Sequence, residues 1–168
     1  MTVGQWLDIW QWDYLGSVKP LTVQTYNKNV RVHIKPALGA VKLEVLDVHM
    51  VQGFINDLGR PHGDKPGLAP KTVKCIHGIL HKALQTAVKV GYLRFNPADS
   101  TELPRSQRRE IKPLDGEAIG AFMNAVQGHR FEPIYLTMLF TGLRRAEACG
   151  LNWEAVDLER GTIHIDRQ

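Results

Sequence analysis

The segment from Pro70 to Lys89 places the strongest constraint on the fold, because its apolar residues recur at spacings of three and four. That period is typical of an amphipathic helix with one buried face. Pro70 suits the first helical turn, and Gly91 follows the expected end. The other face carries four lysines and no acid, at Lys71, Lys74, Lys82 and Lys89. The segment therefore predicts a long helix that packs against other elements and exposes a basic face.

Three earlier segments show the same helical period. They span residues 3–15, 21–34 and 47–58. Thr2 and Asp47 are suitable N-caps for the first and third. Pro36 and Gly39 are expected to end the second. Together with the helix from Pro70, these segments predict a four-helix domain.

Composition excludes several classes of protein. The chain has 168 residues, of which 43% are hydrophobic and 23% charged, so a disordered or collagen-like chain is excluded. The longest apolar run, residues 134–140, is far shorter than the ~20 residues that span a bilayer. Cys75 and Cys149 lie in no disulfide-scaffold pattern. We expect a reducing, intracellular environment and no membrane.

Charge is distributed unevenly along the chain. The net charge is only +4, but residues 19–35 and 69–92 are basic and contain no acid. The acids of the first hundred residues lie outside these two segments. Basic faces on the second and fourth expected helices predict a polyanionic partner.

The second half of the chain begins after a segment without periodicity. Residues 97–112 contain two prolines and several basic residues, including Arg105, Arg108 and Arg109. We interpret them as a basic linker between a domain of residues 1–96 and a domain of residues 113–168. Its arginines are either solvated or follow a phosphate backbone.

Residues 113–168 predict helices followed by a β-hairpin. Asp115 is a suitable N-cap for one helix, and a second apolar helix is expected to stop at Gly142. The tail alternates apolar and polar residues around a turn at residues 159–161, which favours two strands. Because a two-stranded sheet is marginal alone, this domain is expected to be incomplete.

One string, TGLRRAEACGLNW at residues 141–153, resembles the T-G-x-R-x-x-E-x-x-x-L segment that opens the catalytic domain of tyrosine site-specific recombinases, or phage-type integrases. The opening T-V-x-x-W-L, the R-x-N-P after the fourth helix and the hairpin VDLERGTIHI agree with that family in order. The resemblance implies a mainly α chain: a four-helix, SAM-like core-binding domain, then the start of a mixed α/β catalytic domain.

The resemblance also implies site residues. Arg144 matches the first catalytic arginine, which contacts the scissile phosphate, and Glu147 matches an acidic position with a supporting role. A guanidinium suits the phosphate role, because it stays charged and offers paired donors to phosphate oxygens. Residues on the second and fourth helices are expected to face DNA, together with the linker arginines. The helix candidates are Thr22, Thr25, Lys28, Arg31, Lys71, Thr72, Lys74 and His77.

The sequence departs from the family pattern after Arg144. All four tyrosines precede that arginine, so the family's tyrosine nucleophile cannot be placed. We therefore expect a truncated relative or fragment that binds double-stranded DNA as a monomer without cutting it, whereas full-length relatives assemble as oligomers. A bacterial or phage-encoded, cytoplasmic, nucleoid-associated protein follows from the resemblance.

Other readings have weaker support. His77 and His81 beside Cys75 lack a third strong metal ligand, and the sequence contains no nucleotide-binding loop, so no metal or other cofactor is expected. Two other functions stay open. One is a non-catalytic DNA-binding regulator of recombination, and the other is a helical protein-interaction module with an incidental basic face.

Overall fold

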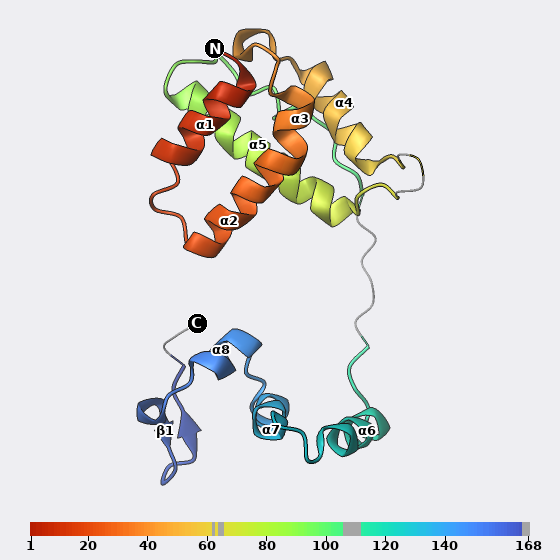
Figure 1. Ribbon diagram of the computed structural model, residues 1–168, viewed down its shortest axis with the longest axis vertical. Helices are drawn as coiled ribbons and strands as arrows, with labels where there is room; N and C mark the ends of the chain where they lie inside the picture. The colour runs from red at the N-terminus through yellow and green to blue at the C-terminus, as the bar shows by residue number, and fades with distance from the viewer. Residues whose placement is uncertain (62, 64–65, 106–111, 166–168) are drawn as a thin grey trace. The chain divides into compact units, whose positions relative to one another are not determined.

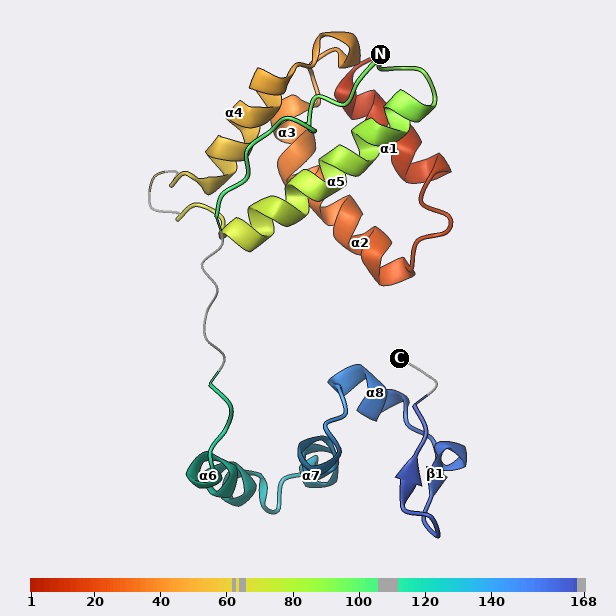
Figure 2. The same ribbon diagram turned by 180° about the vertical axis from the view of Figure 1, so that it is seen from behind.

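The computed structural model describes residues 1–61, 63, 66–105 and 112–165 (Figures 1 and 2). The chain divides into two compact units, Met1–Arg108 and Arg109–Gln168. The first unit is helical, and the second contains helices and a short hairpin. This order of elements confirms the predicted fold class.

The first helix, α1, spans Val3–Asp13 and begins as predicted at Thr2. The Thr2 hydroxyl accepts a hydrogen bond from the Gln5 amide, and the Gln5 side chain accepts one from the Thr2 amide, which satisfies two amides at the helix start. Gly4 lies close to a later segment. Its amide donates to the Gly39 carbonyl over 3.0 Å, and a Cβ at Gly4 would lie only 3.0 Å from that oxygen. Glycine therefore permits this close approach.

The second helical segment is longer than predicted. Helix α2 spans Pro20–Asn29, a π-helical turn η1 spans Val30–Ile34, and α3 spans Lys35–Leu38. The helix continues through Pro36 and ends at Leu38 with Gly39 as its C-cap, so the predicted end is wrong for Pro36 and confirmed for Gly39. A proline lacks an amide proton, and its ring crowds the carbonyl four residues earlier. The Lys35 amide instead bonds to the Val30 carbonyl, five residues back, and this wider turn precedes the proline so that the helix continues.

The remaining helices of this unit follow the predicted boundaries. A 3₁₀ turn, η2, spans Leu43–Val45, and α4 spans Val48–Gly59, with the Asp47 carboxylate accepting from the Met50 amide over 2.7 Å. Helix α5 spans Pro70–Lys89 and has proline in its first turn. The Asp47 cap and the proline at the start of α5 both act within one turn, which explains why the sequence alone located these helix starts.

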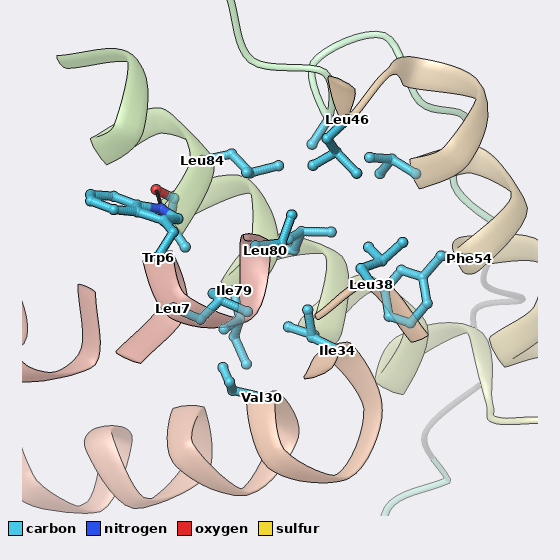
Figure 3. Close-up of a cluster of buried hydrophobic side chains, with 14 of the residues drawn as sticks. Trp6, Leu7, Val30, Ile34, Leu38, Leu46, Phe54, Ile79, Leu80 and Leu84 are labelled. Carbon is cyan, nitrogen blue, oxygen red and sulfur yellow. Dashed lines mark hydrogen bonds between the residues drawn. The ribbon is translucent and has the colours of Figure 1, made fainter. Parts of the chain in front are cut away.

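The hydrophobic core of the first unit lies between α1, the α2–α3 segment, α4 and α5 (Figure 3). The Trp6 ring is fully buried, and its Nε1 donates to the Ala83 carbonyl over 3.0 Å. Trp10 is also buried, and its Nε1 donates to Thr86 Oγ1 over 3.2 Å. These two hydrogen bonds connect α1 to α5. They also give each buried indole N–H group an acceptor, which it would otherwise lack.

The chain after α5 folds back onto the first unit. Asn96 and Ala98 are buried, and Leu103 packs against the core. Asn96 Oδ1 accepts from the Ala98 amide over 3.0 Å, while its Nδ2 donates to the His81 carbonyl over 3.2 Å. The expected linker of residues 97–112 thus begins with residues that pack on the first unit, and the domain boundaries inside it stay a prediction.

The second unit contains α6 (Gly116–Val126), α7 (Glu132–Thr141), α8 (Arg145–Gly150) and a 3₁₀ turn η3 (Trp153–Ala155). Asp115 caps α6 through the Ala118 amide, as predicted. The strands β1 (Val156–Asp157) and β2 (Thr162–Ile163) pair antiparallel, with Val156 opposite Ile163. Large apolar side chains of this unit are exposed, among them Phe140, Trp153 and Leu158.

Candidate nucleic-acid interface and catalytic arginine

The exposed face of α5 is basic, as the sequence predicted. Lys71, Thr72 and Lys74 are exposed in the first turns of α5, while Val73 and Ile76, on the side of the helix opposite the two lysines, are fully buried. Lys82 and Lys89 continue the same exposed face toward the end of the helix. Because a 3.6-residue period returns every seventh or eighth residue to one side, these lysines form a row along the helix.

The candidate residues on α2 and η1 lie mostly in solvent. Thr25, Lys28 and Arg31 are exposed, and Thr22 is half-buried. The Thr25 hydroxyl donates to the Leu21 carbonyl over 3.0 Å, so its oxygen keeps acceptor capacity. Lys35, further along the segment, is instead paired with Asp8 of α1. The exposed positive charge of this segment is therefore concentrated at Lys28 and Arg31.

A cation–π contact connects α5 to α2. Lys82 Nζ of α5 lies 5.4 Å from the centroid of the Tyr26 ring on α2, and Tyr26 stacks on Trp10 of α1 at 5.8 Å and 18°. The aromatic ring attracts the ammonium group and restricts its position beside α2. The sequence places Lys82 on the exposed face of α5, but Lys82 was not among the predicted DNA-binding residues. Its positive charge and its position in the helical period could have identified it. Lys82 is therefore a further candidate for contact with DNA.

His77 lies at the buried edge of α5, not on its exposed face. This side chain is only 9% exposed, and its Nε2 lies 2.7 Å from Thr101 Oγ1 and 3.2 Å from the Ala98 carbonyl. The segment after α5 covers it, so His77 is a packing residue. Burial lowers its pKa below the ordinary value, and the bond to the Ala98 carbonyl opposes that effect. A neutral imidazole inside this contact is the consequence.

The linker arginines are described only in part. Arg105 is exposed, whereas Arg108 and Arg109 lie outside the described residues.

Arg144 and Glu147 lie at the start of α8, immediately after α7 ends at Gly142 in the left-handed conformation, φ 70°. The Arg144 amide donates to Glu147 Oε2 over 2.8 Å, and Arg144 Nη1 donates to Glu147 Oε1 over 2.9 Å. Glu147 is 7% exposed, but the Arg144 side chain is 82% exposed. The carboxylate thus holds both the backbone and the guanidinium of a largely solvent-facing arginine.

The same contacts affect the acidity of Glu147. Its pKa is lowered, first by the hydrogen bond from the Arg144 amide and then by the bond from the Arg144 side chain. Both bonds favour the charged carboxylate. Glu147 is therefore ionised at neutral pH and bound to the arginine, although the catalytic roles of the two residues remain predictions.

Metal-ligating clusters and membrane-spanning helices are both absent from the described part of the chain. His81 pairs with Asp99 over 2.7 Å, but no group of three or more His, Cys, Asp or Glu side chains there could hold a metal ion. Among those residues, no helix is both long and apolar enough to cross a membrane.

Known proteins resemble this chain in both sequence and fold. The model of the phage integrase N-terminal SAM-like domain matches residues 2–59. A tyrosine recombinase XerC-like protein from Caldanaerobacter subterraneus subsp. tengcongensis is 28% identical over 99% of this chain and 44% of its own length. The chain thus spans less than half of that relative.

Solved integrase structures share the fold. The Tn1549 transposon integrase in complex with a circular intermediate DNA superposes with a TM-score of 0.81 at 23% identity, covering 100% of this chain and 53% of that protein. A lambda integrase tetramer bound to a Holliday junction gives 0.77 at 20% identity, over 94% of this chain and 46% of that one. The first unit is thus a SAM-like core-binding domain. A phage integrase SAM-like domain from Moorella thermoacetica is 30% identical, with a TM-score of 0.52 over 66% of this chain and 92% of that one. The chain belongs to the tyrosine recombinase and phage integrase family and also includes part of the catalytic domain.

Proposed function

We propose that this chain binds duplex DNA through the exposed faces of α2 and α5. The observation that carries the proposal is the exposed basic side chains on both segments, Lys28 and Arg31 on one and Lys71 and Lys74 on the other, with Lys82 of α5 against the Tyr26 ring of α2. Basic side chains that neutralise phosphates release counterions, and this release dominates affinity for DNA. The DNA-bound integrases of the same fold support the choice of partner.

We further propose that the chain acts in integration or excision of a mobile element, by the phosphotyrosine transesterification of its family. Arg144 would contact the scissile phosphate, and its exposed guanidinium can donate to two oxygens while Nη1 stays bound to Glu147. Charge that develops on those oxygens during strand cleavage would be stabilised by this fixed donor.

For the 168 residues alone, we propose binding as a monomer without cleavage. All four tyrosines, at positions 14, 26, 92 and 135, precede Arg144. Tyr26 takes part in the aromatic and cation contacts described above, and Tyr92 lies with its ring 5.4 Å from Trp6, so both have structural roles. Incubation with nicked DNA substrates should yield no covalent protein–DNA adduct. A phosphotyrosyl adduct at any of the four would refute this part.

A salt titration tests the binding proposal. The dependence of log affinity on log salt should be steep, and the double variant Lys71→Ala/Lys74→Ala should reduce its slope by about 1.8, because each phosphate contact contributes about −0.9. Lys42→Ala is the matched control, since Lys42 is an exposed lysine just before η2 and away from both faces. Absence of binding at low salt, or equal effects of the double variant and the control, would overturn the proposal.

A further inference from the structure

An exposed glycine lies within the lysine row of α5. Gly78 follows Lys74 by four residues and precedes Lys82 by four, so it sits on the same side of the helix, between the two ammonium groups. Eight residues of helix separate those lysines, which is about 12 Å along the axis at ~1.5 Å per residue. The row therefore contains one position without any side chain.

Nothing in the described part of the chain explains this glycine. A glycine inside a helix costs stability relative to alanine, because it loses more backbone freedom on folding. Gly78 is not among the glycines with positive φ, and a Cβ built on it meets no heavy atom within 4 Å. Neither an unusual backbone conformation nor a close packing contact requires glycine here, in contrast to Gly4.

A partner outside the chain can use the missing side chain. Without a Cβ, the α5 backbone at Gly78 lets another surface come closer than at any neighbouring lysine position. The charges on either side are positive, and no acidic residue occurs between residues 69 and 92. The Tyr26 ring holds Lys82 at one edge of this opening. A narrow polyanion that enters there meets ammonium groups on both sides.

We propose that Gly78 is the point of closest approach between α5 and the sugar–phosphate backbone of DNA. This inference rests on the proposed DNA binding and identifies where on α5 the contact is tightest. A methyl group at position 78 would hold the helix away from the phosphates, so Lys74 and Lys82 could no longer reach them at the same time. Glycine at position 78 thus favours DNA binding, although it lowers the stability of α5 relative to alanine.

The test compares two alanine substitutions at exposed glycines inside helices. Gly53 of α4 is the matched control, since it is also exposed and a Cβ there also meets no heavy atom within 4 Å. Both Gly78→Ala and Gly53→Ala should raise the midpoint of thermal unfolding by about 2–8 °C. Only Gly78→Ala should weaken binding to a duplex DNA probe, by about tenfold at fixed salt.

The outcomes separate this inference from the proposed function. If the unmodified chain binds DNA with a steep salt dependence, but Gly78→Ala binds within twofold of Gly53→Ala, the role of Gly78 is refuted and the DNA interface stands. If the unmodified chain does not bind, the interface itself is refuted. A larger side chain, Gly78→Leu, should weaken binding further than alanine does, and equal or tighter binding by Gly78→Leu would also contradict the proposed close approach.

Discussion

Replacing Asn96 with alanine should destabilise the first unit by about 2 kcal/mol. The Asn96 side chain is 4% exposed and makes three hydrogen bonds, two of which connect the segment after α5 to that helix. Its Nδ2 donates to the His81 carbonyl and to Gln85 Oε1, and its Oδ1 accepts from the Ala98 amide. The cost depends on which of these partners can find a replacement.

The Ala98 amide determines the magnitude. Ala98 is 1% exposed, so its amide would be left buried without the side-chain acceptor, which costs about 1–3 kcal/mol. The His81 carbonyl lies inside α5, where the helix supplies its own donor, and the half-buried Gln85 can turn to water. We therefore expect a loss of unfolding free energy in the middle of this range, about 2 kcal/mol. For a unit of this size, that loss lowers the midpoint of thermal unfolding by about 8–16 °C.

Thermal and urea unfolding followed by tryptophan fluorescence measures this effect. A Trp153→Phe background leaves the remaining tryptophans, Trp6, Trp10 and Trp12, as reporters of the first unit. Asn56→Ala is the control, because Asn56 is an exposed asparagine whose side chain accepts only one described hydrogen bond, from Gln52. It should change stability by no more than about 0.5 kcal/mol. An equally small change for Asn96→Ala would refute the reasoning.

Three further predictions follow from single contacts. Trp6→Phe keeps an aromatic ring but removes the buried donor to Ala83 together with the pyrrole part of the indole, and urea unfolding should show a loss of about 1–3 kcal/mol. A loss below about 0.5 kcal/mol would contradict the role of that bond. Burial lowers the His77 pKa, so the stabilisation by neutral His77 is complete above the unfolded pKa of 6.5 and is lost as pH falls through the folded pKa. The stability difference between the wild type and His77→Gln should therefore shrink below pH 6.5. A difference that does not change with pH would contradict this prediction. The Glu147 pKa is also lowered, so the contact between Glu147 and Arg144 should persist below pH 4.5 and disappear as pH falls through the folded pKa. An NMR titration of the Arg144 amide with a midpoint at or above 4.5 would refute this prediction.

Local signals in the sequence determined most helix boundaries. Thr2, Asp47 and Asp115 each accept from an amide three residues later, so the information for these caps lies within one turn. Gly142 adopts the positive φ that ends α7, which only glycine adopts easily. Pro36 does not end its helix, although proline usually breaks one, because a π-helical turn before it accommodates the ring. That adjustment depends on packing of η1 and has no local signature.

The helical period predicts which residues of the candidate interface are exposed, and the distribution of charge predicts which exposed faces are basic. Lys71 and Lys74 point away from the buried face of α5, as the helical period requires. His77 lies at the edge of that face, where the period does not decide between solvent and core. Its burial results from Thr101 and Ala98, residues that follow it by more than 20 positions. A contact across such a sequence separation cannot be derived from spacing.

The geometry at Arg144 arises differently, because its amide and its guanidinium both donate to a residue three positions away. Glu147 is nearly buried and receives hydrogen bonds from the amide and from Nη1 of Arg144, so the carboxylate fixes the arginine through the first turn of α8. A lysine at position 144 would keep a charge, but its single ammonium could not hold Glu147 and offer a planar pair of donors to a phosphate. The orientation of the guanidinium is thus a local property of the T-G-x-R-x-x-E segment. The sequence could identify this pair because the segment that suggested its function also builds its geometry.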